Sequence, residues 1–250
     1  MLTDTQLRGS LPGIMTRFSV VIPTRNRPHF LAAAIDSVLS QCHPAHEIIV
    51  VDDGAGVMDS LRSRTECLTV LDNRQRGPVP ARNLGVAHAS GDCIAFLDDD
   101  DWWTDRGYLA QVAAAFDAGA DFCFGDGMMV FDNGQAPLPF AFDADAASLE
   151  RDNTILISAV TYRRPLHDLL GPFDEALPYY WDWDWYLRVA RASARLRRIA
   201  RPVTAIRVHG QNMSRDELEG ERRLNLDALA RKHGLPSLTL KNHLSLVMDH

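Results

Sequence analysis

The sequence lacks the features that mark membrane, zinc-ribbon and disulfide-rich proteins. It has no run of about 20 apolar residues and so predicts no transmembrane segment. No CxxC pair occurs among its cysteines, which are Cys42, Cys67, Cys93 and Cys123; this excludes a zinc ribbon and favours buried, reduced thiols. Residues 1–17 have no apolar core typical of a signal peptide, so we expect a flexible N-terminal arm there and a cytoplasmic protein.

The chain also lacks a surplus of basic residues. Its 250 residues include 26 Lys and Arg against 33 Asp and Glu, which gives a formal net charge of -7. Such a chain does not attract nucleic acid or anionic lipid as a whole, so we expect no nucleic-acid partner. With 46% hydrophobic and 24% charged residues, the composition is that of a globular protein with a sizeable core.

Short apolar runs alternate with helical patterns through about residue 125. The runs typical of buried strands are residues 18–23, 47–51, 67–71, 92–97 and 121–124. The helical patterns begin at Pro28, near residues 57–64, at residues 80–89 and around residues 109–116. This alternation implies βαβ units, and therefore an α/β fold with a mostly parallel sheet.

The pattern changes beyond residue 125. Residues 127–165 are mixed, with a hairpin predicted at residues 132–134. Residues 181–192 predict a helix, and residues 196–208 predict two short strands broken at Pro202. Residues 211–250 predict two helices separated by a Gly-Leu-Pro break at residues 234–236.

Aspartates directly follow two of the predicted strands. Four of them, Asp98 to Asp101, come after the buried run at residues 94–97, and Asp52 and Asp53 follow residues 47–51. Open parallel sheets bind ligands beyond the carboxyl ends of their strands. Carboxylates this dense repel one another unless a cation or protons neutralise them, and hard oxygen ligands suit Mg²⁺ or Mn²⁺. The alternative interpretations are an acidic loop that caps the next helix and, for Asp52 and Asp53, a plain turn.

Further candidates lie on predicted helices and at a strand end. Residues 181–185 alternate tryptophan with aspartate, and partial burial between aromatics would make one carboxylate a better base; the alternative is helix capping with core aromatics. Because Asp182 and Asp184 are two residues apart on a helix, only one can point into a given pocket. Arg82, near a helix start, faces either an anionic ligand or solvent, and His209 is either a ligand or structural.

A set of segments resembles, in order, the motifs of the family 2 inverting glycosyltransferases. They are residues 18–27, 47–54, 81–85, 96–102, 171–175 and 182–188, within a match over residues 18–215. The resemblance implies the GT-A fold, with a mostly parallel nucleotide-binding sheet flanked by helices, a small mixed acceptor-side region and C-terminal helices. It implies a domain over residues 18–210, with a nucleotide-sugar half (18–125) and an acceptor half (126–210), followed by a helical extension over residues 211–250.

The resemblance also assigns roles to individual residues. The nucleotide-sugar-binding residues it implies are Pro23, Thr24, Arg25, Asp53, Arg82, Asp98 and Asp99. It implies that Asp100, Asp98 and His209 bind Mn²⁺ or Mg²⁺, and that Asp182 is the catalytic base. The chain departs from the family pattern at Trp181, where a glutamate is usual, and at Asp99, where a small residue is usual.

The implied activity is metal-dependent transfer of a sugar from a nucleotide sugar, typically a UDP-sugar, with inversion. The acceptor would be a hydroxyl of a glycan, a small molecule or a lipid-linked sugar. Two alternatives are a nucleotidyltransferase that makes nucleotide sugars and a non-catalytic nucleotide-sugar or glycan binding module. The absence of glycine from residues 22–30, where the former carries a glycine-rich phosphate loop, argues against it. A DxD motif with a candidate base argues against the latter.

Overall fold

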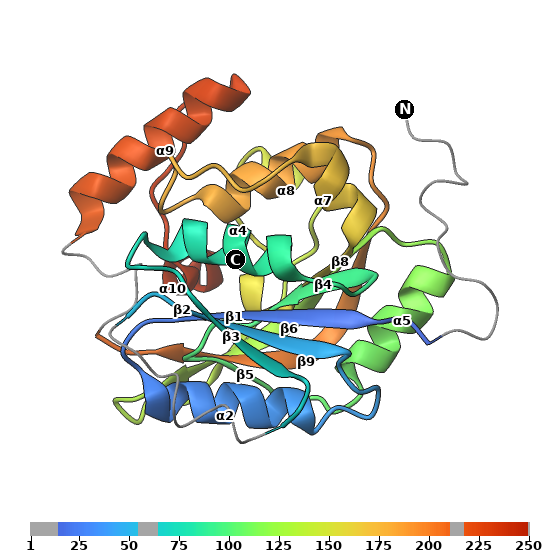
Figure 1. The fold of residues 1–250 in the computed structure, drawn as a ribbon. Helices are drawn as coiled ribbons and strands as arrows, with labels where there is room; N and C mark the ends of the chain where they lie inside the picture. Colours follow the sequence, from blue (N-terminus) through green and yellow to red (C-terminus); the bar gives the residue numbers. More distant parts are fainter. Residues whose placement is uncertain (1–14, 55–64, 211–217, 250) are drawn as a thin grey trace.

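The computed structural model describes residues 15–54, 65–210 and 218–249. The predicted helix at residues 57–64, residues 1–14 of the predicted arm and residues 211–217 of the predicted extension lie outside the described residues. Figure 1 shows a sheet with helices on both of its faces. Among the described helices, none combines the length and the apolar character that crossing a bilayer requires.

Four neighbouring parallel strands form the first half of the sheet. In spatial order they are β3 (Leu68–Asp72), β2 (Glu47–Asp52), β1 (Phe18–Thr24) and β4 (Cys93–Phe96). Alternate residues of β1 pack on opposite faces of the sheet, Val20 and Ile22 into one core and Val21 into the other. Because both faces of the central strands are buried, these strands need apolar residues at successive positions, which is why they read as continuous apolar runs.

The second half of the sheet mixes strand directions. Its strands are β8 (Val160–Arg163), β6 (Phe122–Phe131), β9 (Leu196–Val208), β5 (Trp102–Trp103) and β7 (Leu138–Phe140). Strand β8 is antiparallel to both β4 and β6, whereas β9 runs parallel to β6. The predicted parallel arrangement therefore holds from β1 to β4, and β8 separates these strands from β6.

Strand β9 is continuous across Pro202, where the sequence predicted a break. Its pairing with β6 shifts register on both sides of Asp126, the residue opposite Pro202. A proline has no N–H to donate to a neighbouring strand, and a bulge lets the strand pass this position without leaving the sheet. The hairpin predicted at residues 132–134 is confirmed, since β6 and β7 flank it and Gly134 has a φ of 81°.

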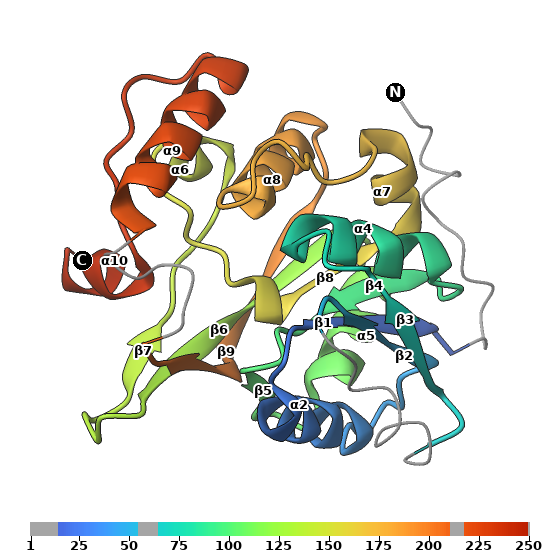
Figure 2. The same cartoon turned by 60° about the vertical axis from the view of Figure 1, so that its left-hand side comes forward.

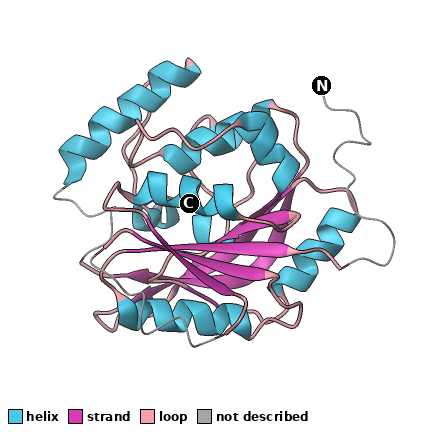
Figure 3. Ribbon diagram, viewed as in Figure 1, coloured by secondary structure: helices cyan, strands magenta, loops and turns pink. Residues whose placement is uncertain are grey.

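Helices cover both faces of the sheet, as Figures 1 and 3 show. One face carries α2 (Pro28–Leu39) and α5 (Tyr108–Asp117). The other carries α4 (Pro78–His88), α7 (Arg164–Leu170) and α8 (Trp181–Arg191). Prolines begin α2 and α4, where the missing N–H would have had no partner within the helix.

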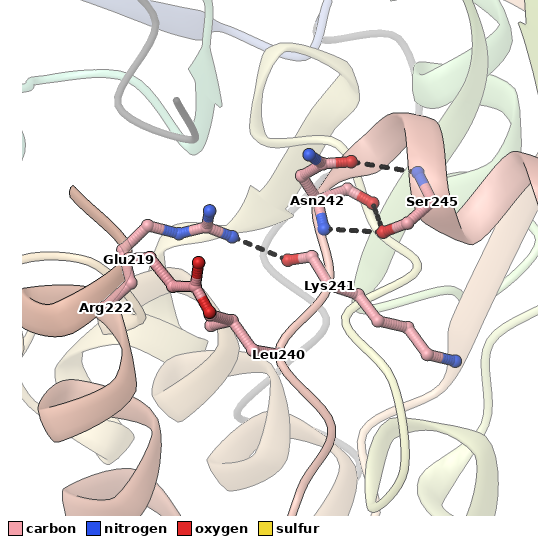
Figure 4. A pocket seen from close by; sticks show the side chains of 6 residues that line it. All are labelled: Glu219, Arg222, Leu240, Lys241, Asn242 and Ser245. Carbon is pink, nitrogen blue, oxygen red and sulfur yellow. Dashed lines mark hydrogen bonds between the residues drawn. The ribbon is translucent and has the colours of Figure 1, made fainter. Parts of the chain in front are cut away.

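Two helices follow β9 near the C-terminal end of the described chain, as predicted. Helix α9 (Glu219–His233) ends at Gly234, whose φ of 65° is the left-handed conformation that often terminates helices. Helix α10 (His243–Met248) comes next, and Figure 2 draws both in the same part of the view as α6 (Ala146–Leu149). A cavity of about 210 Å³ lies between α9 and α10 (Figure 4). There Arg222 Nη2 donates to the carbonyl of Lys241 at 2.7 Å and joins α9 to the segment before α10.

The cysteines differ in exposure. Cys93 and Cys123 are buried in the sheet, and burial raises the pKa of both thiols, so they are unreactive. Cys67 is half-buried and Cys42 is exposed, and all four thiols are free. The prediction of burial is confirmed for two of the four.

Candidate functional site

The predicted site residues gather at one edge of the sheet. Thr24, Asp53 and Asp98 lie at or shortly after the carboxyl ends of β1, β2 and β4. Pro23 and Thr24 are buried at the end of β1, and Arg25 is exposed on the loop that follows. Because β1, β2 and β4 are parallel, their ends meet at the same edge, which is where open α/β sheets bind ligands.

Asp53 is buried and holds the loop that precedes α4. Its Oδ1 accepts hydrogen bonds from Asn73 Nδ2 at 2.6 Å and from the N–H of Gly77 at 3.0 Å. Its own N–H donates to the carbonyl of Thr24 at 2.8 Å. Asp53 thereby links the ends of β1, β2 and β3, and it fixes the loop that leads into α4, the helix that carries Arg82.

Asp99 faces the interior and anchors the aspartate loop to the segment after β1. Thr24 Oγ1 donates to its Oδ2 at 2.6 Å, and the guanidinium of Arg27 donates to both of its oxygens, at 2.5 and 3.2 Å. Burial raises the pKa of Asp99 to about 6, and the charge of Asp100 adds to the effect, while Arg27 and Thr24 oppose it. Its side chain is fully buried, so Asp99 holds the loop in place.

The carboxylates of Asp98, Asp100 and Asp101 converge. They offer oxygen atoms that all lie within 4.8 Å of one another. Asp101 is buried and accepts hydrogen bonds from Ser158 Oγ at 2.5 Å and from the N–H of Arg207 at 3.0 Å. Burial raises the pKa of Asp101 well above its ordinary value, and the neighbouring carboxylates raise it further. Convergent hard oxygens are the ligands that Mg²⁺ and Mn²⁺ prefer, so these residues fit a divalent cation.

His209 borders this group on one side. It follows β9, and its Nε2 lies 3.0 Å from Asp100 Oδ2. Its ring packs against Phe30, with ring centroids 5.5 Å apart. Arg27 Nη1 also donates to Asp100 Oδ2 at 2.6 Å, so a cation and an imidazole meet at this one carboxylate. The structure thus brings His209 to the aspartate loop, against Asp100.

Arg82 connects the aspartate loop to helix α8. It is buried in α4, donates to the carboxylate of Asp98, and donates to the carbonyl of Pro78 at 3.1 Å. Its guanidinium lies over the ring of Trp181, 4.5 Å from the centroid. A cation stacked on an indole is attracted by the negative face of the ring. Arg82 therefore brings the first turn of α8 next to Asp98.

Asp182 lies in this first turn of α8 and is half-buried. Asn153 Nδ2 donates to its Oδ2 at 3.0 Å. Burial raises the pKa of Asp182 to about 6, although hydrogen bonds from Asn153 and the N–H of Trp183 and the charge of Arg82 favour the charged form. A carboxylate with a pKa near the working pH is suited to general base catalysis.

Asp184 points to the opposite side of α8. It is fully buried and interacts with Arg188 Nε at 3.0 Å, Lys232 Nζ at 2.7 Å and His233 Nε2 at 2.8 Å. Burial alone would raise its pKa, but these hydrogen bonds and positive charges hold the pKa of Asp184 below its ordinary value. Its partners Lys232 and His233 belong to α9, so Asp184 joins two helices and is far less available to a substrate than Asp182.

The sequence is related to known glycosyltransferases. The family model described as glycosyl transferase family 2 matches residues 19–139. The uncharacterized glycosyltransferase YwdF of Bacillus subtilis (strain 168) is 38% identical over 245 residues, which cover 93% of this chain and 90% of YwdF. The chain belongs to glycosyltransferase family 2. The family resemblance predicted from its motifs, and the transferase activity that goes with it, are confirmed.

This glycosyltransferase also resembles solved structures. TarS from S. aureus in complex with UDP-GlcNAc is similar with a TM-score of 0.69 at 21% identity, over 86% of this chain and 66% of that chain. This chain thus spans just under two thirds of that TarS chain. PcManGT, a mannosyltransferase from Pyrobaculum calidifontis in complex with GDP-Man and Mn2+, has a TM-score of 0.66 at 17% identity, over 93% and 71% of the two chains. These similarities confirm the predicted GT-A fold.

The tryptophans of this glycosyltransferase belong to the core. Trp181, Trp183 and Trp185 are at most 5% exposed and pack in the cluster between α8 and the sheet. Trp183 Nε1 donates to the carbonyl of Leu149 at 2.7 Å. Their faces are covered by other side chains, so the rings are the core aromatics that the alternative interpretation of this segment expected.

Three residues at the site were not among the predicted site residues. Asp101 belongs to the converging carboxylates, and its place in the run of aspartates was a visible signal. Arg27 binds Asp99 and Asp100, and it was visible only as the last residue of the first family motif. Asn153 contacts Asp182 and lies in a segment whose sequence carries no motif.

Proposed function

We propose that this glycosyltransferase moves a sugar from a nucleotide sugar to an acceptor hydroxyl with inversion of configuration. The donor that we propose is a UDP-sugar. The observation that carries the proposal is the position of Asp182. It is a half-buried carboxylate of raised pKa, and Arg82 stacks on the neighbouring Trp181 while binding Asp98 of the aspartate loop. The proposed base and the cluster of oxygen ligands thus lie on either side of Arg82. A single displacement would use the base at the acceptor hydroxyl and the oxygen ligands, through a cation, at the leaving diphosphate.

The donor residues that we propose surround the carboxyl ends of β1, β2 and β4. Asp53 would accept a hydrogen bond from an N–H of the donor's nucleobase, and Arg82 would lie near that nucleobase. The other proposed residues would line the nucleotide-sugar pocket; they are Pro23, Thr24, Arg25, Asp98 and Asp99. Asp99 is buried against Thr24 and Arg27, so we propose that it acts by fixing the loop on which its neighbours bind.

We propose that Asp98, Asp100 and Asp101 hold Mn²⁺ or Mg²⁺, with His209 beside them. A bound divalent cation would offset the negative charge that develops on the leaving diphosphate. The structural neighbour PcManGT, seen in complex with GDP-Man and Mn2+, supports this proposal. Arg27 binds Asp100 and Arg82 binds Asp98, and each arginine holds its carboxylate in position.

In the proposed reaction Asp182 takes the proton of the acceptor hydroxyl. The hydroxyl oxygen attacks the anomeric carbon from the face opposite the nucleotide, and the nucleoside diphosphate leaves. One displacement inverts the configuration of that carbon. General base catalysis typically contributes about 10²- to 10⁴-fold, so Asp182→Asn should lose about that much in rate with little change in donor affinity.

Donor binding can be tested by thermal unfolding in the presence of nucleotide sugars. UDP-GlcNAc and GDP-mannose are suitable probes, because TarS and PcManGT are seen with these donors. A donor at 100 times its Kd adds about 2.7 kcal/mol of stability, or roughly 5 to 11 °C for a chain of this size. With Mn²⁺ present we expect one donor to raise the Tm by this amount. The increase should disappear in excess chelator or in Asp100→Asn.

The chemistry is tested by the products. Transfer should release a nucleoside diphosphate and form a glycoside of inverted configuration, which NMR of the anomeric proton identifies. Slow hydrolysis of the donor should release a nucleoside diphosphate and the free sugar. Pyrophosphate released from a sugar phosphate and a nucleoside triphosphate would instead establish a nucleotidyltransferase. Donor binding without any turnover would establish a binding module.

A further inference from the structure

The segment between α6 and the 3-10 turn η1 (Ile157–Ala159) reaches the proposed base. In this segment Asn153 places its Nδ2 3.0 Å from Oδ2 of Asp182. A carboxylate accepts hydrogen bonds only, so the amide must present its N–H group to a charged Asp182. The contact therefore stabilises the charged carboxylate and also fixes which of its oxygens is engaged.

The carbonyl oxygen of the Asn153 side chain has, within the part of the chain that the structure describes, no hydrogen bond to match that of its Nδ2. Its Oδ1 is buried and has no hydrogen-bond partner among the described residues. Buried polar atoms in folded proteins nearly always have a partner, and an exception calls for an explanation. Here the fold leaves Oδ1 unpaired while it keeps Nδ2 on Asp182. The contact with the carboxylate is therefore the interaction that determines where this side chain lies.

The chain immediately before Asn153 is held by α8 and by the segment before α10. Trp183 of α8 donates from Nε1 to the carbonyl of Leu149 at 2.7 Å. Lys241, which lies just before α10, forms an ion pair with Asp152 at 3.0 Å. The N–H of Asp152 also donates to the carbonyl of Ser148 at 3.0 Å. Because these contacts hold the chain immediately before Asn153, they limit where its side chain can lie.

Resting on the proposed function, we infer that Asn153 is a positioning residue for the base. It binds Oδ2 of Asp182 and leaves Oδ1 of that carboxylate to receive the proton of the acceptor hydroxyl. Besides Asn153, the N–H of Trp183 and the charge of Arg82 of α4 also act on Asp182, and the hydroxyls of Tyr180 at the start of α8 and Tyr186 within it face the same carboxylate. Arg82 is the charged one, so Asn153 and Arg82 together favour the ionised carboxylate against its burial.

The test measures the pKa of Asp182. The protein is labelled with ¹³C at the aspartate carboxyl carbons, and NMR monitors the Asp182 resonance as the pH is changed. The Asp182 resonance is assigned as the one missing from Asp182→Asn. In Asn153→Leu, which has similar volume and no donor, we expect the pKa of Asp182 to rise by about one pH unit, the effect of losing one hydrogen bond to a charged group. Asn153→Ser, whose side chain is too short to reach, should show the same rise if the leucine variant does not fold.

Asn225 offers a matched control. It lies in α9, donates from Nδ2 to the carbonyl of Glu221 at 3.2 Å, and has a buried Oδ1 without a described partner, like Asn153. Asn225→Leu should leave the titration of Asp182 unchanged. The acidic limb of the pH profile for donor turnover should move upward in the Asn153 variants alone, by the same amount as the NMR titration, with the donor KM unchanged.

The possible outcomes separate the two claims. If Asp182→Asn keeps normal turnover, the proposed base is wrong, whatever the Asn153 variants do. If Asp182→Asn is inactive and Asp182 titrates in both Asn153 variants as it does in the unmodified protein, the positioning role is refuted and the proposed function stands. An equal rise in Asn225→Leu would also refute it, because the effect would then come from general loosening of the fold.

Discussion

Replacing Asp182 with asparagine should stabilise this glycosyltransferase at neutral pH while removing most of its activity. Burial raises the pKa of Asp182 from 3.8 to about 6 in the folded protein. Between these two pH values the unfolded chain has released the proton that the folded chain still holds, so the free energy of unfolding falls as the pH rises. Above pH 6 the fold carries the full penalty of this charge, and below pH 3.8 it carries none.

The size of the effect follows from the same two values. A pKa raised from 3.8 to about 6 corresponds to about 3 kcal/mol at neutral pH. Because the side chain is only half-buried, screening by solvent reduces the penalty to a value between about 1 and 3 kcal/mol. For a chain of this length we therefore expect Asp182→Asn to raise the Tm by roughly 2 to 12 °C at pH 8. The difference should vanish near pH 4.

The assay is thermal unfolding of both proteins at pH 4, 6 and 8, with turnover of the donor measured at pH 8. Asp184→Asn is the matched control, since it makes the same chemical change two residues away. Asp184 is fully buried against Arg188, Lys232 and His233, so its loss should cost about 3 kcal/mol and lower the Tm by roughly 6 to 12 °C. A Tm of Asp182→Asn at pH 8 below that of the unmodified protein, or a difference independent of pH, would refute the reasoning.

Three further predictions concern the packing around the site. Arg27→Met should lower the free energy of unfolding by roughly 3 kcal/mol in urea titrations at pH 8, because the buried carboxylate of Asp99 then loses its positively charged partner. The loss should be smaller at pH 5, where Asp99, with a pKa of about 6, is protonated; an equal loss at both pH values would contradict this. Gly85→Ala should destabilise by about 1 to 3 kcal/mol in the same titration, since the new Cβ would meet Val21 Cγ1 at 2.5 Å. This clash should outweigh the gain of about 1 kcal/mol in helix propensity. A variant more stable than the unmodified protein would show that α4 can shift away from β1 and avoid the clash. Arg222→Met should lower the Tm by a few degrees, because a charged donor to the chain before α10 is lost, and unchanged melting would assign that bond no structural role.

Most of the parallel half of the sheet could be predicted from the sequence. Strands β1, β2 and β4 are buried on both faces, so each appears as an apolar run that local reading detects. Their carboxyl ends are marked by polar residues, which identified the edge where the site lies. Strand β8 carried no comparable signal, because a four-residue strand is too short to show a period, and its place between β4 and β6 depends on long-range pairing.

The choice of the proposed base shows the limit of local information. Helical periodicity indicates that Asp182 and Asp184 face different directions, and it leaves open which of them faces the site. The proposal of Asp182 is supported by Lys232 and His233, nearly fifty residues along the chain, which contact Asp184. The contact between Asn153 and Asp182 likewise depends on tertiary structure, because Asn153 lies in a segment without a motif.

The sequence by itself determined the family, the order of the early strands and helices, and the concentration of carboxylates after β4. These properties are local, since they depend on which residues adjoin one another and on how often apolar residues recur. Only the tertiary structure decided which charges meet, with Arg27 on Asp99 and Asp100, and Arg82 on Asp98. A charge removed from water must find a partner, and the partner that it finds depends on which distant segments the packing of the core brings beside it.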